Sequence, residues 1–187
     1  MSVQRISRDA ILLALLCVTG MFSLPLGDNI KVSMQLLTLF IIFGITDKLL
    51  DKIIIPSLYL VIGLFIPVYA GFQAGITPTF GFVIAFTVAG IPFHFIYKYL
   101  KINITVRYVL ACLVSLILVY AIGTVYLMLY LNIDINKALM IAIVPYLPFD
   151  GGKIAICTIV MHAMPAHIKN PAKNEVVKED IRKDAEA

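Results

Sequence analysis

Two side chains of opposite charge, Asp150 and Lys153, stand three positions apart in the middle of a long apolar stretch. We expect them to be the only charged side chains deep in the apolar part of the chain. A charge placed inside a bilayer costs about 2.5–3.5 kcal/mol on insertion scales, so such residues indicate a functional site. Their spacing lets both reach one helix face and pair there. Together they offer a hydrogen-bond donor and an acceptor to a polar ligand; the alternative is an ion pair that fixes helix packing.

Prolines and glycines surround the charged pair. Pro145 and Pro148 precede it, and Gly151 and Gly152 lie within it. These residues predict a broken or kinked helix. Backbone groups freed by a break in a membrane span must be buried in protein or line a cavity. The kink and the charges together therefore predict a cavity beside Asp150.

The composition predicts an integral membrane protein. Hydrophobic residues make up 61% of the chain, charged residues 14%, and the mean hydropathy is +0.98. A soluble domain of 187 residues could not cover that much apolar surface. The net charge of +4 is scattered over helix ends, so we expect no nucleic-acid partner. The three cysteines lie in separate apolar runs without close spacing, and we interpret them as buried free thiols.

Polar breaks divide the chain into six apolar segments, each near the roughly 20 residues that one membrane span needs. They predict an all-α six-helix bundle over residues 1–166, followed by a polar, partly disordered cytoplasmic tail over residues 167–187. The segments run approximately over Ala10–Leu26, Val32–Ile45, Ile53–Tyr69, Thr79–Tyr99, Val106–Leu131 and Ala138–Met164.

Six spans with both ends on one side sort the basic residues unequally. The opposite side holds Lys31 and Lys137, and Lys153 lies within a span. By the positive-inside rule both termini are cytoplasmic, so Asp150 lies toward the outer half of the sixth span. The cytoplasmic side then holds Arg5, Arg8, Lys48, Lys52, Lys98, Lys101, Arg107, Lys169, Lys173, Lys178, Arg182 and Lys183.

Other polar residues join the candidate site. Gln35 lies in the second apolar segment, and a buried amide needs partners, either another helix or a ligand. The outer connector between the third and fourth segments is rich in glycine and predicts a lid or pocket wall. Its candidate residues are Tyr69, Phe72, Gln73, Thr77 and Thr79, and Tyr146 precedes Asp150.

Several other chemistries are excluded or disfavoured. The histidines lack the spacing and neighbours of a metal site, so we expect neither a metal nor a cofactor. Gly151-Gly152-Lys153 lacks the earlier glycine and the following Ser or Thr of a phosphate-binding loop. A membrane enzyme using Asp150 and Lys153 as acid and base, and a helix-packing scaffold, stay open as alternatives.

Three stretches resemble the biotin-specific substrate-binding (S) component of energy-coupling factor (ECF) transporters, the BioY family. The resemblance covers about residues 5–165. Glycines of the family pattern are replaced here by Thr77, Phe80 and Phe149, which would alter the shape of the pocket. The matching stretches are Val32-Ser33-Met34-Gln35-Leu36-Leu37, Gly63–Gly71 with Thr77–Phe82, and Leu147-Pro148-Phe149-Asp150-Gly151-Gly152-Lys153.

The resemblance implies a six-helix S component in the cell membrane, with an outward-facing vitamin site capped by loops. It implies no ATP hydrolysis by this chain, and partners in a transmembrane coupling (T) protein and two cytoplasmic ATPases. Ala10 and Ala14, at i, i+4, match the family's usual contact for the coupling protein. Asp150, Lys153, Gln35 and Thr79 would then bind the polar groups of biotin, and Tyr69, Phe72 and Tyr146 its apolar body. An S component for another vitamin, such as thiamine or riboflavin, is the alternative within the class.

Overall fold

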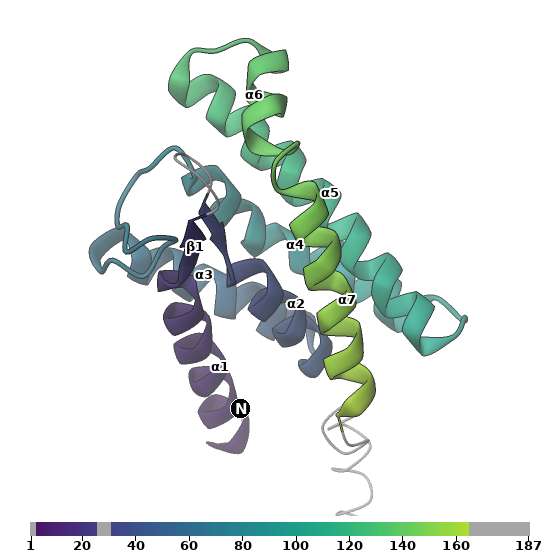
Figure 1. The fold of residues 1–187 in the computed structure, drawn as a ribbon. Coiled ribbons are helices and arrows are strands. Elements are labelled where there is room, and N and C mark those ends of the chain that lie inside the picture. Colours follow the sequence, from purple (N-terminus) through teal and green to yellow (C-terminus); the bar gives the residue numbers. More distant parts are fainter. Residues whose placement is uncertain (1–2, 26–30, 165–187) are drawn as a thin grey trace, which may run out of the picture.

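A computed structural model gives the fold over residues 3–25 and 31–164 (Figure 1). The predicted tail, residues 167–187, lies outside this described part. Seven helices and two short strands follow one another in these ranges: α1 (Val3–Met21), β1 (Ser23–Pro25), β2 (Lys31–Ser33), α2 (Gln35–Ile45), α3 (Leu49–Phe65), α4 (Phe80–Tyr99), α5 (Ile104–Leu131), α6 (Ile135–Ala142) and α7 (Leu147–Ala163).

The prediction of six helices is therefore not confirmed for the described residues. The difference lies in the sixth apolar segment, which the structure divides into α6 and α7 with a bend of 45° between them. Pro145 lies in the break and Pro148 in the first turn of α7, where its missing N–H is tolerated. The kink predicted from these prolines is confirmed.

The first two predicted spans also need correction at their facing ends. The first helix begins at Val3 and ends at Met21. Ser23–Pro25, which was predicted to belong to this helix, is a strand. It pairs antiparallel with Lys31–Ser33, and Ser23 lies opposite Ser33. The all-α prediction thus misses one two-stranded ladder. Alternating polar and apolar residues over such short stretches give too weak a signal to separate a strand from a helix end.

The short helix α2 runs through the core of the bundle. At 11 residues it is about 16 Å long, too short to cross a bilayer unaided. Leu39, Phe40, Ile42 and Phe43 on α2 are completely buried. Helix α7 packs on α2 and α5, α1 packs on α2 and α3, and α4 lies between α3 and α5. Figure 1 shows α6 standing apart from this group, against the far end of α5.

The apolar helices indicate a membrane protein. By length and composition α4 and α5 could each cross a membrane, and α6 with α7 could form a third, bent span. Large apolar side chains point outward along these helices, including Ile117 and Leu129 on α5 and Ile159 on α7, each about two-thirds exposed in the isolated chain. Such a surface is stable when lipid covers it.

Candidate binding site

Asp150 and Lys153 lie in the first turns of α7 and form an ion pair. The Lys153 ammonium donates to Asp150 Oδ1 at 2.7 Å, the i, i+3 contact expected on one helix face. Both residues are buried, with 4% and 7% of their surface exposed. Within the described residues the prediction that these are the only buried charges is nevertheless wrong, as Asp51 and Lys52 show below.

Tyr120 on α5 is the third member of the site, and the sequence analysis missed it. Its hydroxyl donates to Asp150 Oδ2 at 2.5 Å, so each carboxylate oxygen has one donor. A hydrogen bond from a neutral hydroxyl to a carboxylate is short and strong. In the sequence, Tyr120 is a tyrosine near the middle of a 28-residue apolar helix. An aromatic residue at such a position usually packs in the core, so it did not indicate a site.

The break before α7 places Tyr146 one turn ahead of Asp150. The Asp150 amide donates to the Tyr146 carbonyl at 2.9 Å, and the Tyr146 amide donates to Ile143 at 3.0 Å. Tyr146 is half-buried. Gly151 and Gly152 lie on the exposed side of α7, where a methyl group added at either would meet no atom within 4 Å. The two glycines therefore lie on another face of the helix than the buried Asp150–Lys153 pair, and the cavity beside Asp150 stays a prediction.

Gln35 occupies a second polar network at the start of α2. Its amide donates to the Tyr59 hydroxyl, which in turn donates to the Val68 carbonyl at 2.9 Å. The Gln35 amide oxygen accepts from the Ser33 hydroxyl at 3.3 Å. Gln35 thus links the strand ladder, α3 and the connector after α3. The helix–helix hydrogen bond considered from the sequence is present.

Helices α2 and α7 run in the same direction and bring the two networks to one level. The Cys157 thiol donates to the Leu37 carbonyl at 3.3 Å, and Met161 packs on Gly44 further along. Gln35 precedes Leu37 on α2, and Lys153 precedes Cys157 on α7. Gln35 and Lys153 therefore lie at the same end of the α2–α7 pair. The structure therefore gathers the polar groups predicted from distant parts of the sequence at one end of the bundle.

The connector between α3 and α4 forms a compact loop near the same end. Tyr69 is buried at 1% exposure, its hydroxyl donates to Leu60 at 2.6 Å, and its backbone bridges to Gln73. Phe72 is 64% exposed and has φ 58°, a left-handed conformation that is uncommon for a bulky residue. The hydroxyls of Thr77 and Thr79 lie 3.1 Å apart. The loop thus presents Phe72 outward and holds Tyr69 inward.

Ala10 and Ala14 lie away from this site, on the outer face of α1. Both are exposed, and their exposed neighbours Ile11 and Leu15 are apolar. A helix face with small residues at this spacing permits close approach of another helix.

A second cluster of buried charges joins α1 to α3. Asp51, 1% exposed, pairs with Arg5 and with Arg8, whose guanidinium lies 2.8 Å from Asp51 Oδ2. The neighbouring ammonium of Lys52, also 1% exposed, donates to the carbonyls of Phe43 and Thr46. The sequence analysis counted Lys52 among the basic residues of the cytoplasmic side and did not predict that it and Asp51 are buried in α3.

Metal binding finds no support in the part of the chain that the structure describes. No group of three His, Cys, Asp or Glu side chains there could hold an ion. Cys17, Cys112 and Cys157 are free thiols, as predicted, but only Cys112 and Cys157 are buried, whereas Cys17 is partly exposed.

Comparison with known proteins gives a consistent result. The model of the BioY family matches residues 1–170. The biotin transporter BioY of Thermotoga maritima is 24% identical over 162 residues, which covers 84% of this chain and 94% of that protein.

A crystal structure of the S-component for biotin from an ECF-type ABC transporter has the same fold. The TM-score is 0.74 at 20% identity, over 86% of this chain and 92% of that one. The family, the relative and the fold are those of transport proteins, which confirms the prediction that this chain is not an enzyme. The match of the family model covers all of residues 1–166, the predicted membrane part, and shows that the chain belongs to the BioY family.

Proposed function

We propose that this protein binds biotin at an outward-facing site in the cell membrane and is the substrate-specific subunit of an ATP-driven ECF importer. One observation carries the ligand site: the buried Asp150 carboxylate is fixed by Tyr120 and Lys153 in the first turns of α7. Family membership and the likeness to a biotin S-component support the choice of ligand.

The chemistry of biotin suits this arrangement. Its ureido ring carries two N–H donors and one carbonyl, and Asp150 would accept from the N–H groups in charge-assisted hydrogen bonds. Lys153 would stay paired with Asp150 or donate to the ureido carbonyl or the carboxylate of the ligand. Because both side chains are already oriented in a mostly apolar surrounding, little ordering would accompany binding.

The remaining candidates would complete the pocket from the connector and the strand ladder. Thr77, Thr79 and Gln73 would supply neutral polar contacts, as would the amide of Gln35. Phe72, which is exposed, would close over the ligand, and Tyr146 would pack on the apolar body of biotin. Tyr69, being buried, would support this wall from behind.

Transport requires partners. The proposed arrangement has six spans with α6 and α7 as one bent span, and both termini in the cytoplasm. A transmembrane coupling protein and two cytoplasmic ATPases would supply the energy, with Ala10 and Ala14 on α1 at the contact with the coupling protein. Exposure of both alanines supports this assignment.

Equilibrium binding of radiolabelled biotin to the purified chain tests the ligand site. We expect saturable binding that excess thiamine or riboflavin does not displace, and a large loss in Asp150→Asn. Asp134→Asn is the matched control, since Asp134 is exposed and caps α6, where Asn serves equally well. Biotin affinity in Asp150→Asn equal to that of the unaltered protein would refute the role of Asp150, and displacement by another vitamin would refute biotin as the ligand.

Co-purification tests the partners separately. Ala10→Trp and Ala14→Trp should reduce recovery of the coupling protein and the ATPases while leaving biotin binding unchanged. Ile11→Trp, at an exposed apolar position between them, is the comparison. Full recovery of the complex with both alanines replaced would refute this contact.

A further inference from the structure

The end of helix α1 lies directly against the polar network around Gln35. The last buried residue of α1 is Gly20. A methyl group at Gly20 would lie 2.5 Å from the Tyr59 hydroxyl oxygen and 2.5 Å from the Val68 carbonyl oxygen, closer than side chains come to other atoms in proteins. The backbone of α1 therefore reaches the network only because this position carries no side chain.

The Gln35 amide at this contact has hydrogen-bonding capacity left for a ligand. Its nitrogen donates to Tyr59, and its oxygen accepts from Ser33. A side-chain amide has two N–H groups and two acceptor lone pairs, so one of each is unused among the described residues. The Tyr59 hydroxyl, which orients the amide, is itself fixed by its bond to the Val68 carbonyl. A shift of Tyr59 would therefore turn the unused half of the amide out of its present direction.

Helix α1 is held on α3 at both of its ends. At its start, the guanidinium groups of Arg5 and Arg8 pair with Asp51, which is buried in the first turn of α3. At its end, Gly20 meets Tyr59 in the middle of the same helix. Because the ion pairs fix α1 along α3, the position of the Tyr59 hydroxyl depends on both helices.

We propose that Gly20 is a positioning residue for ligand binding. Through Tyr59 it orients the Gln35 amide. Through Val68 it sets the position of the connector after α3, because the next residue, Tyr69, forms the backbone bridge that holds this loop. The inference rests on the proposed function, in which Gln35 and the connector contact biotin. A side chain at position 20 would push α1 and the network apart and lower biotin affinity without touching the ligand.

The test compares Gly20→Ala with a matched overpacked variant in the full purified chain. We expect the biotin dissociation constant of Gly20→Ala, measured by titration calorimetry, to rise about tenfold, the upper end of what one neutral hydrogen bond contributes. Gly90→Ala is the control, since its methyl group would lie 2.7 Å from the Lys52 carbonyl oxygen, at the opposite end of α3 from Val68. Both variants should unfold at a lower temperature, and only Gly20→Ala should bind biotin more weakly.

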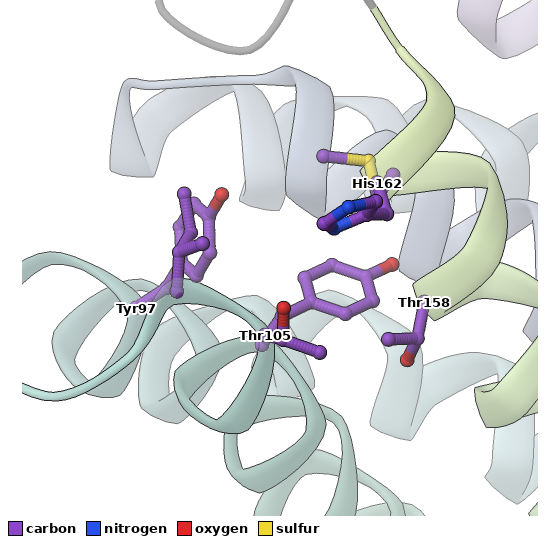
Figure 2. A pocket seen from close by; sticks show the side chains of 7 residues that line it. Tyr97, Thr105, Thr158 and His162 are labelled. Carbon is purple, nitrogen blue, oxygen red and sulfur yellow. The ribbon is translucent and has the colours of Figure 1, made fainter.

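A second control adds volume where the chain has room. Figure 2 shows a hollow with Tyr97 and Thr105 on one side and Thr158 and His162 on the other, where α4 ends and α5 begins. Its volume for the centres of water-sized groups is about 30 Å³. Thr158→Ile makes this side chain one heavy atom larger and should change neither the unfolding temperature nor the affinity for biotin.

Two further measurements separate positioning from general stability. Gln35→Leu removes the amide and keeps the volume, so Gly20→Ala should cost much less affinity in that background than in the unaltered protein. Hydrogen exchange without biotin reports on the connector, where the Tyr69 and Gln73 amides donate to each other's carbonyls. Both amides should exchange faster in Gly20→Ala and at the normal rate in Gly90→Ala.

The outcomes separate this inference from the proposed function. Unchanged biotin affinity in Gly20→Ala, or an equal loss in Gly90→Ala or Thr158→Ile, would overturn the positioning role. Losses that multiply fully in the double variant with Gln35→Leu would overturn action through the amide. Failure of the unaltered protein to bind biotin would refute the proposed function, and connector exchange that Gly20→Ala leaves unchanged would overturn the role of Gly20 with no ligand present.

Discussion

The hydroxyl of Tyr120 and the carboxylate of Asp150 lie 2.5 Å apart, although 30 positions separate them in the chain. This contact links α5 to the first turn of α7, and the other carboxylate oxygen, Asp150 Oδ1, accepts a hydrogen bond from Lys153. Orientation of the carboxylate therefore depends on two helices and not on the i, i+3 pair alone.

Tyr120→Phe removes this hydroxyl and keeps the ring. We expect biotin affinity to fall by about 10- to 100-fold, because one hydrogen bond to a charged group contributes about 1.5–3 kcal/mol. Titration calorimetry of the purified variant measures the change. Tyr130→Phe, on an exposed part of the same helix, should bind biotin normally. A loss of the same size in both variants would mean that Tyr120 does not act through Asp150.

The ion pair itself predicts a non-additive effect on stability. Asp150→Asn or Lys153→Met alone leaves one buried charge uncompensated, which should lower the free energy of unfolding by about 3 kcal/mol. The double variant should lose clearly less than the sum of the two, since it leaves no buried charge. Reversible unfolding in mixed micelles measures all three. Strictly additive losses would show that the two charges do not depend on each other.

Lys52 has a structural role at the opposite end of α2. Its ammonium satisfies the carbonyls of Phe43 and Thr46 and lies 5.2 Å from the centre of the Phe93 ring. Lys52→Met should lower the free energy of unfolding by about 2–4 kcal/mol, because the buried carbonyls lose their donor. Lys48→Met, exposed one turn earlier, should change it by less than about 0.5 kcal/mol. Similar stability of the two variants would contradict this role.

The sequence was sufficient for the apolar segments, the membrane class and the break before Asp150, because each depends on local composition or on proline. It was not sufficient for the partners of buried polar groups. Tyr59 and Tyr120 are ordinary apolar-segment tyrosines until the fold places them beside Gln35 and Asp150. Likewise, Asp51 and Lys52 look solvated because their neighbours are polar, and it is the packing of α1, α2 and α4 around α3 that buries them.

The connector after α3 depends on Gly63. A methyl group at this position would overlap the ring of Tyr69, whose backbone bridge to Gln73 holds the loop. Gly63→Ala should therefore destabilise the protein by about 1–3 kcal/mol, as overpacking does, and should weaken biotin binding through the displaced loop.

Gly151→Ala is the matched control for that substitution, because Gly151 lies on the exposed side of α7. A methyl group there meets no atom of the chain within 4 Å, so the helix should gain up to about 1 kcal/mol of stability. Biotin affinity should stay unchanged in Gly151→Ala, whereas Gly63→Ala should lower stability and affinity together. Thermal unfolding and calorimetry on both variants separate the two effects. An equal loss of biotin affinity in both variants would show that the loss in Gly63→Ala does not come from the displaced loop.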